Sequence, residues 1–109
     1  MTVGLESFPP RDRHRERSAL TRAVLLAACR SFMKAGEFRP PMQACCLRAA
    51  RSMQTGYQIF RTVEAFHLEA ADDPPTLDAI VERVVGDERA ALPAETLCRL
   101  VRAVVTGRG

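Results

Sequence analysis

Apolar residues recur at intervals of three and four along most of this chain, and this spacing constrains the fold more than any other feature. Two stretches show it in full: Leu77, Ile80, Val81, Val84 and Val85, and further on Leu97, Leu100, Val101, Val104 and Val105. The spacing places apolar side chains on one face of an α-helix, whereas a half-buried strand requires strict alternation of apolar and polar residues. Alternation is nowhere sustained, so the sequence predicts an all-α fold of about six helices.

Glycines, prolines and hydroxyl side chains divide the chain into the predicted helices. Ser18, Ser52 and Thr62 are predicted N-caps, because their side-chain oxygens can accept a hydrogen bond from an amide of the first helical turn. Gly36 and Pro41 mark the end of one helix and the start of the next. The predicted helices span residues 18–35, 41–49, 52–60, 62 to the Asp72-Asp73 pair, 76–85 and 93–106.

The size and composition of the chain predict one domain with a single core. Its 109 residues, 47% of them hydrophobic and 27% charged, are enough for one domain and too few for two. The longest apolar run ends at Arg30, well short of the ~18 residues that a membrane-spanning helix needs. The N-terminus also lacks the charged-then-apolar order of a secretory signal. We therefore expect a cytoplasmic protein with no membrane partner.

Charges are unevenly divided along the sequence. Residues 1–61 contain eleven Lys and Arg against four Asp and Glu, a balance of +7, whereas residues 62–109 contain five against nine, a balance of −4. A basic half is typical of a nucleic-acid-binding protein, and an acidic half suits self-association or a protein partner. A solvated surface with no binding role would give the same counts, so this alternative stays open.

Arginines alternate with other polar residues just before the first predicted helix, at Arg11, Arg13, Arg15 and Arg17. Such an arm can reach phosphates or the minor groove of a duplex, and it can equally be a solvated lead-in to the helix. We predict that residues 1–17 form a flexible basic arm.

The segment SMQTGYQIF, from Ser52 to Phe60, interrupts the alanine-rich pattern with polar side chains. It forms the second of two short predicted helices, which are separated by a tight turn at Ala50 and Arg51. This arrangement is typical of a helix-turn-helix, whose second helix enters the major groove of DNA. A groove-facing helix must present polar side chains to base edges and phosphates, so it cannot also be apolar all round.

Two stretches share residue types at fixed offsets with a known family. Residues 21–36 read TRAVLLAACRSFMKAG and residues 45–66 read CCLRAARSMQTGYQIFRTVEAF. They resemble the DNA-binding domain of the tetracycline-repressor (TetR-like) family, with Thr55, Tyr57 and Phe60 at the positions of its threonine, tyrosine and phenylalanine. The resemblance implies a sequence-specific regulator of transcription that binds double-stranded DNA.

Three residues of the motif depart from the family pattern. Ala50 stands where the family usually has a turn glycine, Gly56 replaces a large apolar residue, and Val63 replaces a lysine that commonly meets phosphate. A glycine inside a helix costs about 1 kcal/mol relative to alanine, so Gly56 requires tertiary support or a close approach of two backbones. Arg51 and Arg61 flank this helix and are expected to supply the missing phosphate contact.

Roles for the polar residues follow from their chemistry. Gln54 is the best predicted base reader, because its amide can pair with adenine through two hydrogen bonds. Met53 and Thr55 can meet a thymine methyl group, and the hydroxyls of Ser52 and Tyr57 can hold phosphate. Core packing stays open as the alternative for Tyr57. The predicted DNA contacts are, in full, Arg13, Arg15, Arg17, Arg51, Ser52, Met53, Gln54, Thr55, Tyr57, Gln58, Arg61 and Thr62.

The chain thus has three predicted parts: the arm, a TetR-like helix-turn-helix domain over residues 18–73, and two amphipathic helices within residues 74–109. Only 35 residues follow Pro74, too few for the family's ligand-binding domain, so no small-molecule ligand is expected. The last two helices are expected to pack on the DNA-binding domain or to form a homodimer. The rival interpretation is a protein-interaction module that regulates transcription by holding a partner, such as a protein of the transcription machinery.

No constellation of residues points to an enzyme, a metal or a cofactor. His14 and His67 lack a Ser or Cys partner at a suitable spacing, and His67 is expected on a helix surface. The cysteines match no zinc or disulfide spacing and are expected to be buried free thiols. They are Cys29, Cys45, Cys46 and Cys98.

Overall fold

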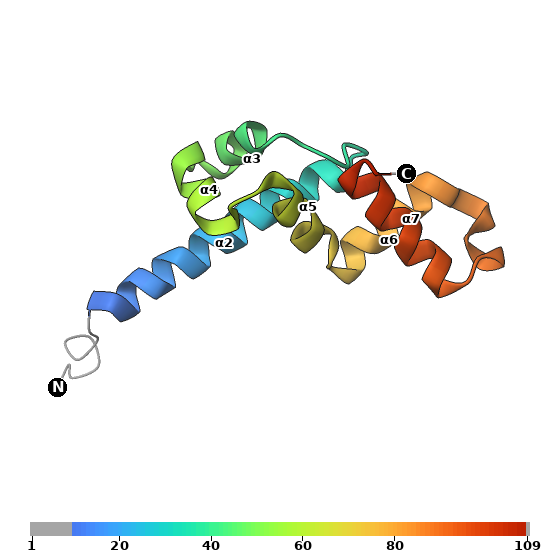
Figure 1. The fold of residues 1–109 in the computed structure, drawn as a ribbon, viewed down its shortest axis with the longest axis horizontal. Helices are drawn as coiled ribbons and strands as arrows, with labels where there is room; N and C mark the ends of the chain where they lie inside the picture. The colour runs from blue at the N-terminus through green and yellow to red at the C-terminus, as the bar shows by residue number, and fades with distance from the viewer. Residues whose placement is uncertain (1–9, 109) are drawn as a thin grey trace.

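The computed structural model describes the backbone of residues 10–108 and the side chains of residues 15–108. Over this range the chain forms six α-helices and one 3₁₀ segment and contains no strand, which confirms the predicted all-α class. The helices are α2 (Pro10–Lys34), α3 (Met42–Ala49), α4 (Met53–Phe60), α5 (Val63–Ala71), α6 (Pro74–Val85) and α7 (Ala94–Thr106), and the 3₁₀ segment is η1 (Gly86–Ala91) (Figure 1).

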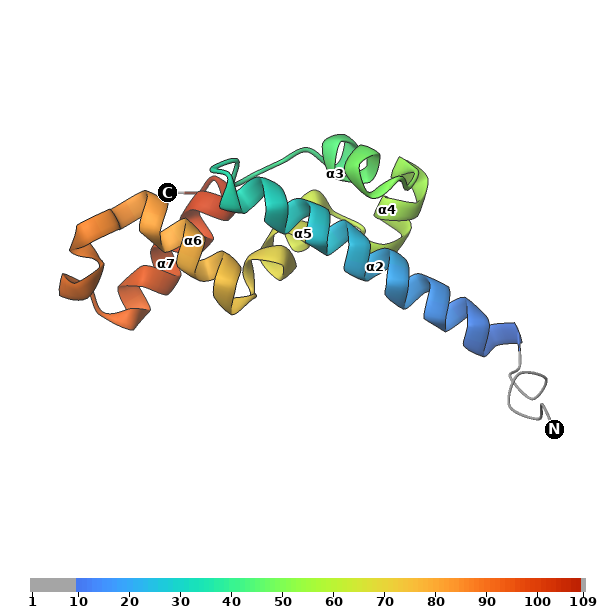
Figure 2. The same ribbon diagram turned by 180° about the vertical axis from the view of Figure 1, so that it is seen from behind.

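The long helix α2 is the axis of the molecule. It contacts α3, α4, α5 and α6, whereas α7 packs against α5 and α6 at the other end (Figure 1). Seen from behind, the first turns of α2 project past every other helix (Figure 2). The molecule is therefore elongated, with the pair α3–α4 near its N-terminal end and the pair α6–α7 near its C-terminal end.

One core joins the two ends. Its fully buried side chains include Leu25 and Met33 from α2, Phe66 from α5, Ile80 from α6 and Val105 from α7. Each such apolar side chain contributes about 1.5–3 kcal/mol when it leaves water. The single core agrees with the prediction from chain length, and it fixes α4 and α5 relative to α2.

Helix α2 begins at Pro10, not at the predicted cap Ser18. Proline is favoured in the first turn of a helix, and residues 11–17 are arginines, acids and one histidine with no glycine or second proline to stop the helix. The segment predicted as an arm is thus helical from Pro10 onward, and Ser18 is an exposed mid-helix residue. The predicted contact Arg13 has its side chain outside the part of the chain that the structure describes.

The caps of α4 and α5 are as predicted. Ser52 Oγ accepts a hydrogen bond from the Thr55 amide at 3.1 Å, and Thr62 Oγ1 accepts one from the Ala65 amide at 3.1 Å. Helix α6 starts two residues before the predicted Thr76, because the Asp73 carboxylate accepts hydrogen bonds from both the amide and the hydroxyl of Thr76. The hydroxyl bond in particular lowers the pKa of Asp73.

The prediction that His67 lies on a helix surface is wrong. His67 is 5% exposed, and its Nε2 lies 2.6 Å from the backbone oxygen of Pro40. Since a carbonyl only accepts, Nε2 donates, and burial lowers the pKa of the imidazole so that the neutral form is favoured. The bond ties α5 to the loop before α3, a contact between residues 27 positions apart that no local pattern reveals.

Three of the four cysteines are buried, as expected, at Cys29, Cys45 and Cys46. Cys98 is exposed, which corrects the prediction for that residue. Among the described residues no group of His, Cys, Asp and Glu is arranged to hold a metal ion. No described helix is both long enough and apolar enough to cross a membrane.

Candidate nucleic-acid interface

The turn between α3 and α4 is closed by a residue in the left-handed conformation. Ala50 has φ 56° and ψ 46°, and the Arg51 amide donates to the Cys46 carbonyl at 2.9 Å. This geometry normally selects glycine, because the Cβ of other residues crowds the following carbonyl at a cost of about 1–2 kcal/mol. Ala50 therefore closes the tight turn between α3 and α4 in a conformation that glycine would adopt at lower cost.

Arg51 fastens this turn to α2. Its Nε donates to Thr21 Oγ1 at 3.3 Å, and its Nη1 donates to the carbonyls of Ala49 at 3.1 Å and Ala50 at 3.3 Å. The guanidinium thus satisfies carbonyls at the C-terminus of α3 that would otherwise lack partners. If Arg51 contacts a ligand, it does so with a side chain that also holds the turn in place.

Gly56 is a point of close contact between α4 and α3. A Cβ at this position would lie 2.9 Å from Met42 Sδ and 3.0 Å from Cys46 Sγ, both on α3. Only a glycine permits this approach without a shift of its neighbours. The close contact of two helices therefore accounts for the glycine within α4.

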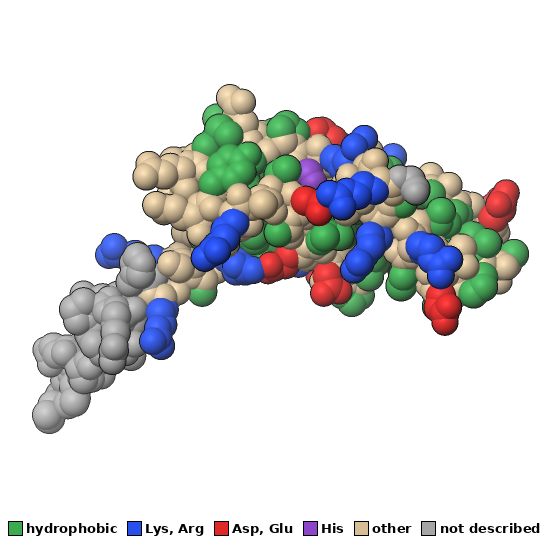
Figure 3. Space-filling model, viewed as in Figure 1, with side chains coloured by type: hydrophobic (Ala, Val, Ile, Leu, Met, Phe, Trp, Pro, Cys, Tyr) green, Lys and Arg blue, Asp and Glu red, His purple; other side chains and the backbone are tan. Residues whose placement is uncertain are grey.

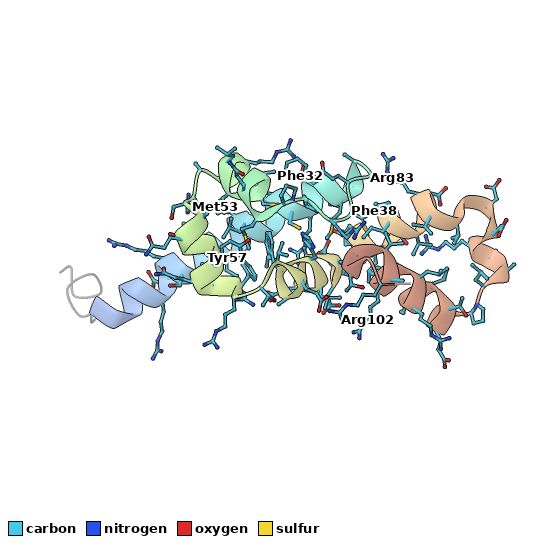
Figure 4. The ribbon with its side chains drawn as sticks, turned by 45° about the horizontal axis from the view of Figure 1, so that its top comes forward. Phe32, Phe38, Met53, Tyr57, Arg83 and Arg102 are labelled. Atoms are coloured by element: carbon cyan, nitrogen blue, oxygen red, sulfur yellow. The ribbon has the colours of Figure 1, made fainter. Side chains whose placement is uncertain are left out.

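The outward face of α4 is an exposed stripe of mixed polar and apolar side chains. Met53, Gln54, Tyr57, Gln58 and Arg61 are all exposed, at the spacing of one helical face. Met53 and Tyr57 are each 41% exposed and lie one turn apart on α4 (Figure 4). The exposure excludes the core-packing alternative for Tyr57.

The inward face of α4 is held by aromatic and ionic contacts. Phe60 is 5% exposed and its ring lies 4.5 Å from the ring of Phe66. The guanidinium of Arg22, on α2, lies 4.8 Å from the Phe60 ring centroid. Its Nε and Nη2 both donate hydrogen bonds to the Glu69 carboxylate. The sequence does not reveal this role of Arg22, since its partner Glu69 lies 47 residues away.

The remaining predicted contacts of α4 and its flanks also serve the local structure. Thr55 is partly buried, and its Oγ1 lies 2.8 Å from Ser52 Oγ. Thr62 is exposed and caps α5. Arg15 and Arg17 are exposed on the projecting end of α2.

Arg61 occupies an unusual conformation at the end of α4. It has φ 60° and ψ −52°, and the Thr62 amide donates back to the Phe60 carbonyl across it. For a non-glycine residue this three-residue turn costs about 1–3 kcal/mol. The turn places the exposed Arg61 side chain at the junction of α4 and α5.

The surface formed by α3, the turn and α4 lacks acidic residues. From Phe38 to Val63 the chain has Arg39, Arg48, Arg51 and Arg61 and no Asp or Glu. Figure 3 shows no acidic side chain over α3 and α4 on the face drawn, while acidic side chains appear over the other helices. The side chains that α3, the turn and α4 contribute therefore carry positive formal charge and no negative charge, and the N-terminal amides of α4 add a partial positive charge.

The comparisons with known proteins add no further assignment. No protein-family model, curated protein or solved structure matches this chain. The residues and geometry of the site are therefore the basis for the function proposed below.

Proposed function

We propose that this chain is a sequence-specific regulator of transcription that binds double-stranded DNA, with α3 and α4 as a helix-turn-helix of the TetR-like type. The observation that carries the proposal is the outward face of α4, which is exposed, free of acidic residues and set on a glycine contact with α3. A helix of this kind fits the major groove, which is about 12 Å wide. The protein would act in the cytoplasm.

The exposed side chains divide by chemistry. Gln54 and Gln58 lie one turn apart and can each pair with adenine through two hydrogen bonds, and Met53 can contact a thymine methyl group. The Tyr57 hydroxyl and the Arg61 guanidinium suit phosphate, which sets register without reading sequence. Arg15 and Arg17 on the projecting helix would extend the phosphate contacts beyond α4.

A homodimer would complete the function. Two-fold pairing of helix-turn-helix domains places the recognition helices about 34 Å apart, one turn of the duplex, and doubles the phosphate contacts. The end of the molecule formed by α6 and α7 is remote from α4 (Figure 1), so pairing there leaves both recognition helices free. Measurement of the mass in solution tests this part of the proposal.

One observation favours a protein partner as the second candidate. Met53 and Tyr57 form an exposed pair, and Leu47 on the neighbouring helix is 74% exposed. Methionine and tyrosine are enriched in protein interfaces. Under this interpretation the same face of α4 would hold a protein of the transcription machinery.

Selection from a random duplex library, followed by titration with the selected duplex, separates the two candidates. We expect the Gln54→Ala variant to lose about 1–3 kcal/mol of preference for its base pair, since one two-bond contact is removed. Arg61→Gln should weaken binding to all duplexes alike and reduce the salt slope by about one. Lys34→Gln, which removes one exposed positive charge at the C-terminal end of α2, is the control and should bind as the parent does.

Arg51 is a less clean probe, because its loss would also loosen the turn. If no sequence is enriched from the library, and Gln54→Ala and Arg61→Gln bind DNA as the parent does, DNA recognition by α4 is refuted. Loss of a co-purifying protein in a Met53→Ala/Tyr57→Ala variant would then support the second candidate.

A further inference from the structure

A groove lies between α5 and α7, lined by residues of both helices and by Arg108. It has a volume of about 450 Å³ and an apolar floor that includes Leu68, Leu100 and Ala103, all of them partly exposed. Small-molecule sites commonly have volumes of roughly 300–1,000 Å³ and a mainly apolar lining with a few polar groups. The groove is thus of a size for a small ligand.

Three of the five arginines in the acidic half of the chain line this groove. They are Arg99, Arg102 and Arg108. Arg99 and Arg102 are three residues apart on α7 and therefore share a face. Figure 3 shows basic side chains gathered over α7, and Figure 4 shows Arg102 projecting from it.

The groove is positively charged in spite of the acidic composition around it. Glu64 is its one acidic lining residue and lies 3.0 Å from Arg108, so three arginines and one glutamate give a balance of +2. Arg99 and Arg102 form no ion pair with any acidic side chain in the described part of the chain. Two guanidinium groups are thus free to bind an anion beside an apolar floor.

We propose that this groove binds an amphiphilic carboxylate, a molecule with one carboxylate head and a short apolar chain. The carboxylate would bind Arg99 and Arg102, since the planar guanidinium matches a carboxylate with two parallel hydrogen bonds. The apolar chain would cover Leu68, Leu100 and Ala103. The expectation of no small-molecule ligand rested on the length of the C-terminal segment alone, whereas this groove also uses α5.

Charge complementarity and size together select this occupant. A neutral apolar molecule would leave the two guanidinium groups unused, and an inorganic anion would leave the apolar floor exposed. A volume of about 450 Å³ also falls in the range of small-molecule sites.

Substitution of Glu64 tests the proposal through a gain in octanoate affinity, whereas substitution of the arginines tests it through a loss. Its carboxylate occupies Arg108 and repels an incoming anion, so its removal should strengthen binding. We expect Glu64→Gln to bind octanoate more tightly than the parent protein does. The Arg99→Gln/Arg102→Gln variant should bind octanoate at least about tenfold more weakly, because each charge-assisted hydrogen bond is worth roughly a factor of ten.

Isothermal titration of the full chain with octanoate, in the absence of DNA, measures these affinities. 1-Octanol is the matched neutral probe and should bind at least about tenfold more weakly than octanoate. The Arg89→Gln variant removes an arginine that does not line the groove and should keep the parent affinity. Equal octanoate binding by the parent, Arg99→Gln/Arg102→Gln and Glu64→Gln proteins would overturn the proposal, as would no binding by the parent. Neither result bears on DNA recognition, which is measured without octanoate.

Discussion

At the scale of single residues, Ala50 and Gly56, two of the three residues that depart from the TetR-like pattern, have opposite effects on the fold. Ala50 adopts a conformation that glycine tolerates better, whereas a Cβ at Gly56 would crowd the side chains of Met42 and Cys46. Sequence analysis identified both positions as exceptions. Whether each residue lowers or raises the stability could not be predicted. The effect depends on a backbone angle at Ala50 and on a contact with α3 at Gly56.

The Ala50→Gly substitution should stabilise the protein. It removes about 1–2 kcal/mol of left-handed strain and loses part of that gain to the greater freedom of glycine in the unfolded chain, which leaves about 0.5–1 kcal/mol. Urea denaturation should show a higher midpoint with an unchanged slope. Ala44→Gly, in the first turn of α3, is the control and should lose up to about 1 kcal/mol. A midpoint for Ala50→Gly at or below that of the parent would contradict the assignment of strain to this turn.

The Gly56→Ala substitution should destabilise the protein although alanine is the better helix former. The gain in helix propensity is about 1 kcal/mol, and overpacking against Met42 and Cys46 costs about 1–3 kcal/mol, so we expect a net loss of up to about 2 kcal/mol. Denaturation of Gly56→Ala, Cys46→Ala and the double variant measures the coupling. The loss from Gly56→Ala should shrink by at least about 0.5 kcal/mol in the Cys46→Ala background, and strict additivity would argue against the close contact.

At the scale of helices, the sequence predicts those features that depend only on residues close together in the chain. Ser52 and Thr62 cap their helices as predicted, because a cap needs only a hydroxyl and an amide three residues later. The sequence does not mark the start of α2, because nothing between Pro10 and Ser18 ends a helix and an arginine-rich segment also suits a flexible arm. The burial of His67 was missed because its partner Pro40 lies on another element.

The projecting end of α2 has few tertiary contacts. Every side chain from Arg15 to Leu20 is exposed, and Leu20 is 58% exposed. Isolated helices shorter than about 12–15 residues are marginal in water, so this end gains stability only by continuing the packed part of α2. Its helical hydrogen bonds should open more often than those further along α2.

Hydrogen exchange tests this difference. We expect amides of residues 15–19 to exchange at least about tenfold faster than those of Cys29 and Met33, which lie in the core. Addition of the selected duplex should slow exchange at residues 15–19 if Arg15 and Arg17 contact phosphate. Uniform exchange along α2 without DNA would contradict the account of its free end.

At the scale of the whole molecule, the distribution of charge along the sequence differs from its distribution over the folded surface. The basic half contributes the acid-free surface of α3 and α4, as its composition indicated. The acidic half nevertheless gathers Arg99, Arg102 and Arg108 in one groove. Counts along a chain cannot show this, because the convergence depends on how α7 packs against α5.

The stability of the whole protein should fall as the solution becomes mildly acidic, and His67 should be the cause. Burial lowers the pKa of His67 in the folded state, whereas the unfolded chain has the ordinary value of about 6.5. Below pH 6.5 the unfolded state therefore binds more protons than the folded state. The contribution of His67 to the free energy of unfolding is fully present above pH 6.5. Below pH 6.5 it decreases by up to about 1.4 kcal/mol per pH unit, until the pH passes the pKa of His67 in the folded state.

Urea denaturation at pH 7.5, 6.0 and 5.0 measures this dependence, and His67→Gln isolates its source. The glutamine amide can still donate to the Pro40 carbonyl but does not titrate, so the variant should lack most of the loss between pH 6.5 and 5. The lowered pKa of Asp73 acts only below its ordinary value of 3.8 and leaves this range unaffected. Parallel profiles for the parent and His67→Gln would mean that His67 accepts a proton equally well in both states, which a buried imidazole donating to Pro40 should not do.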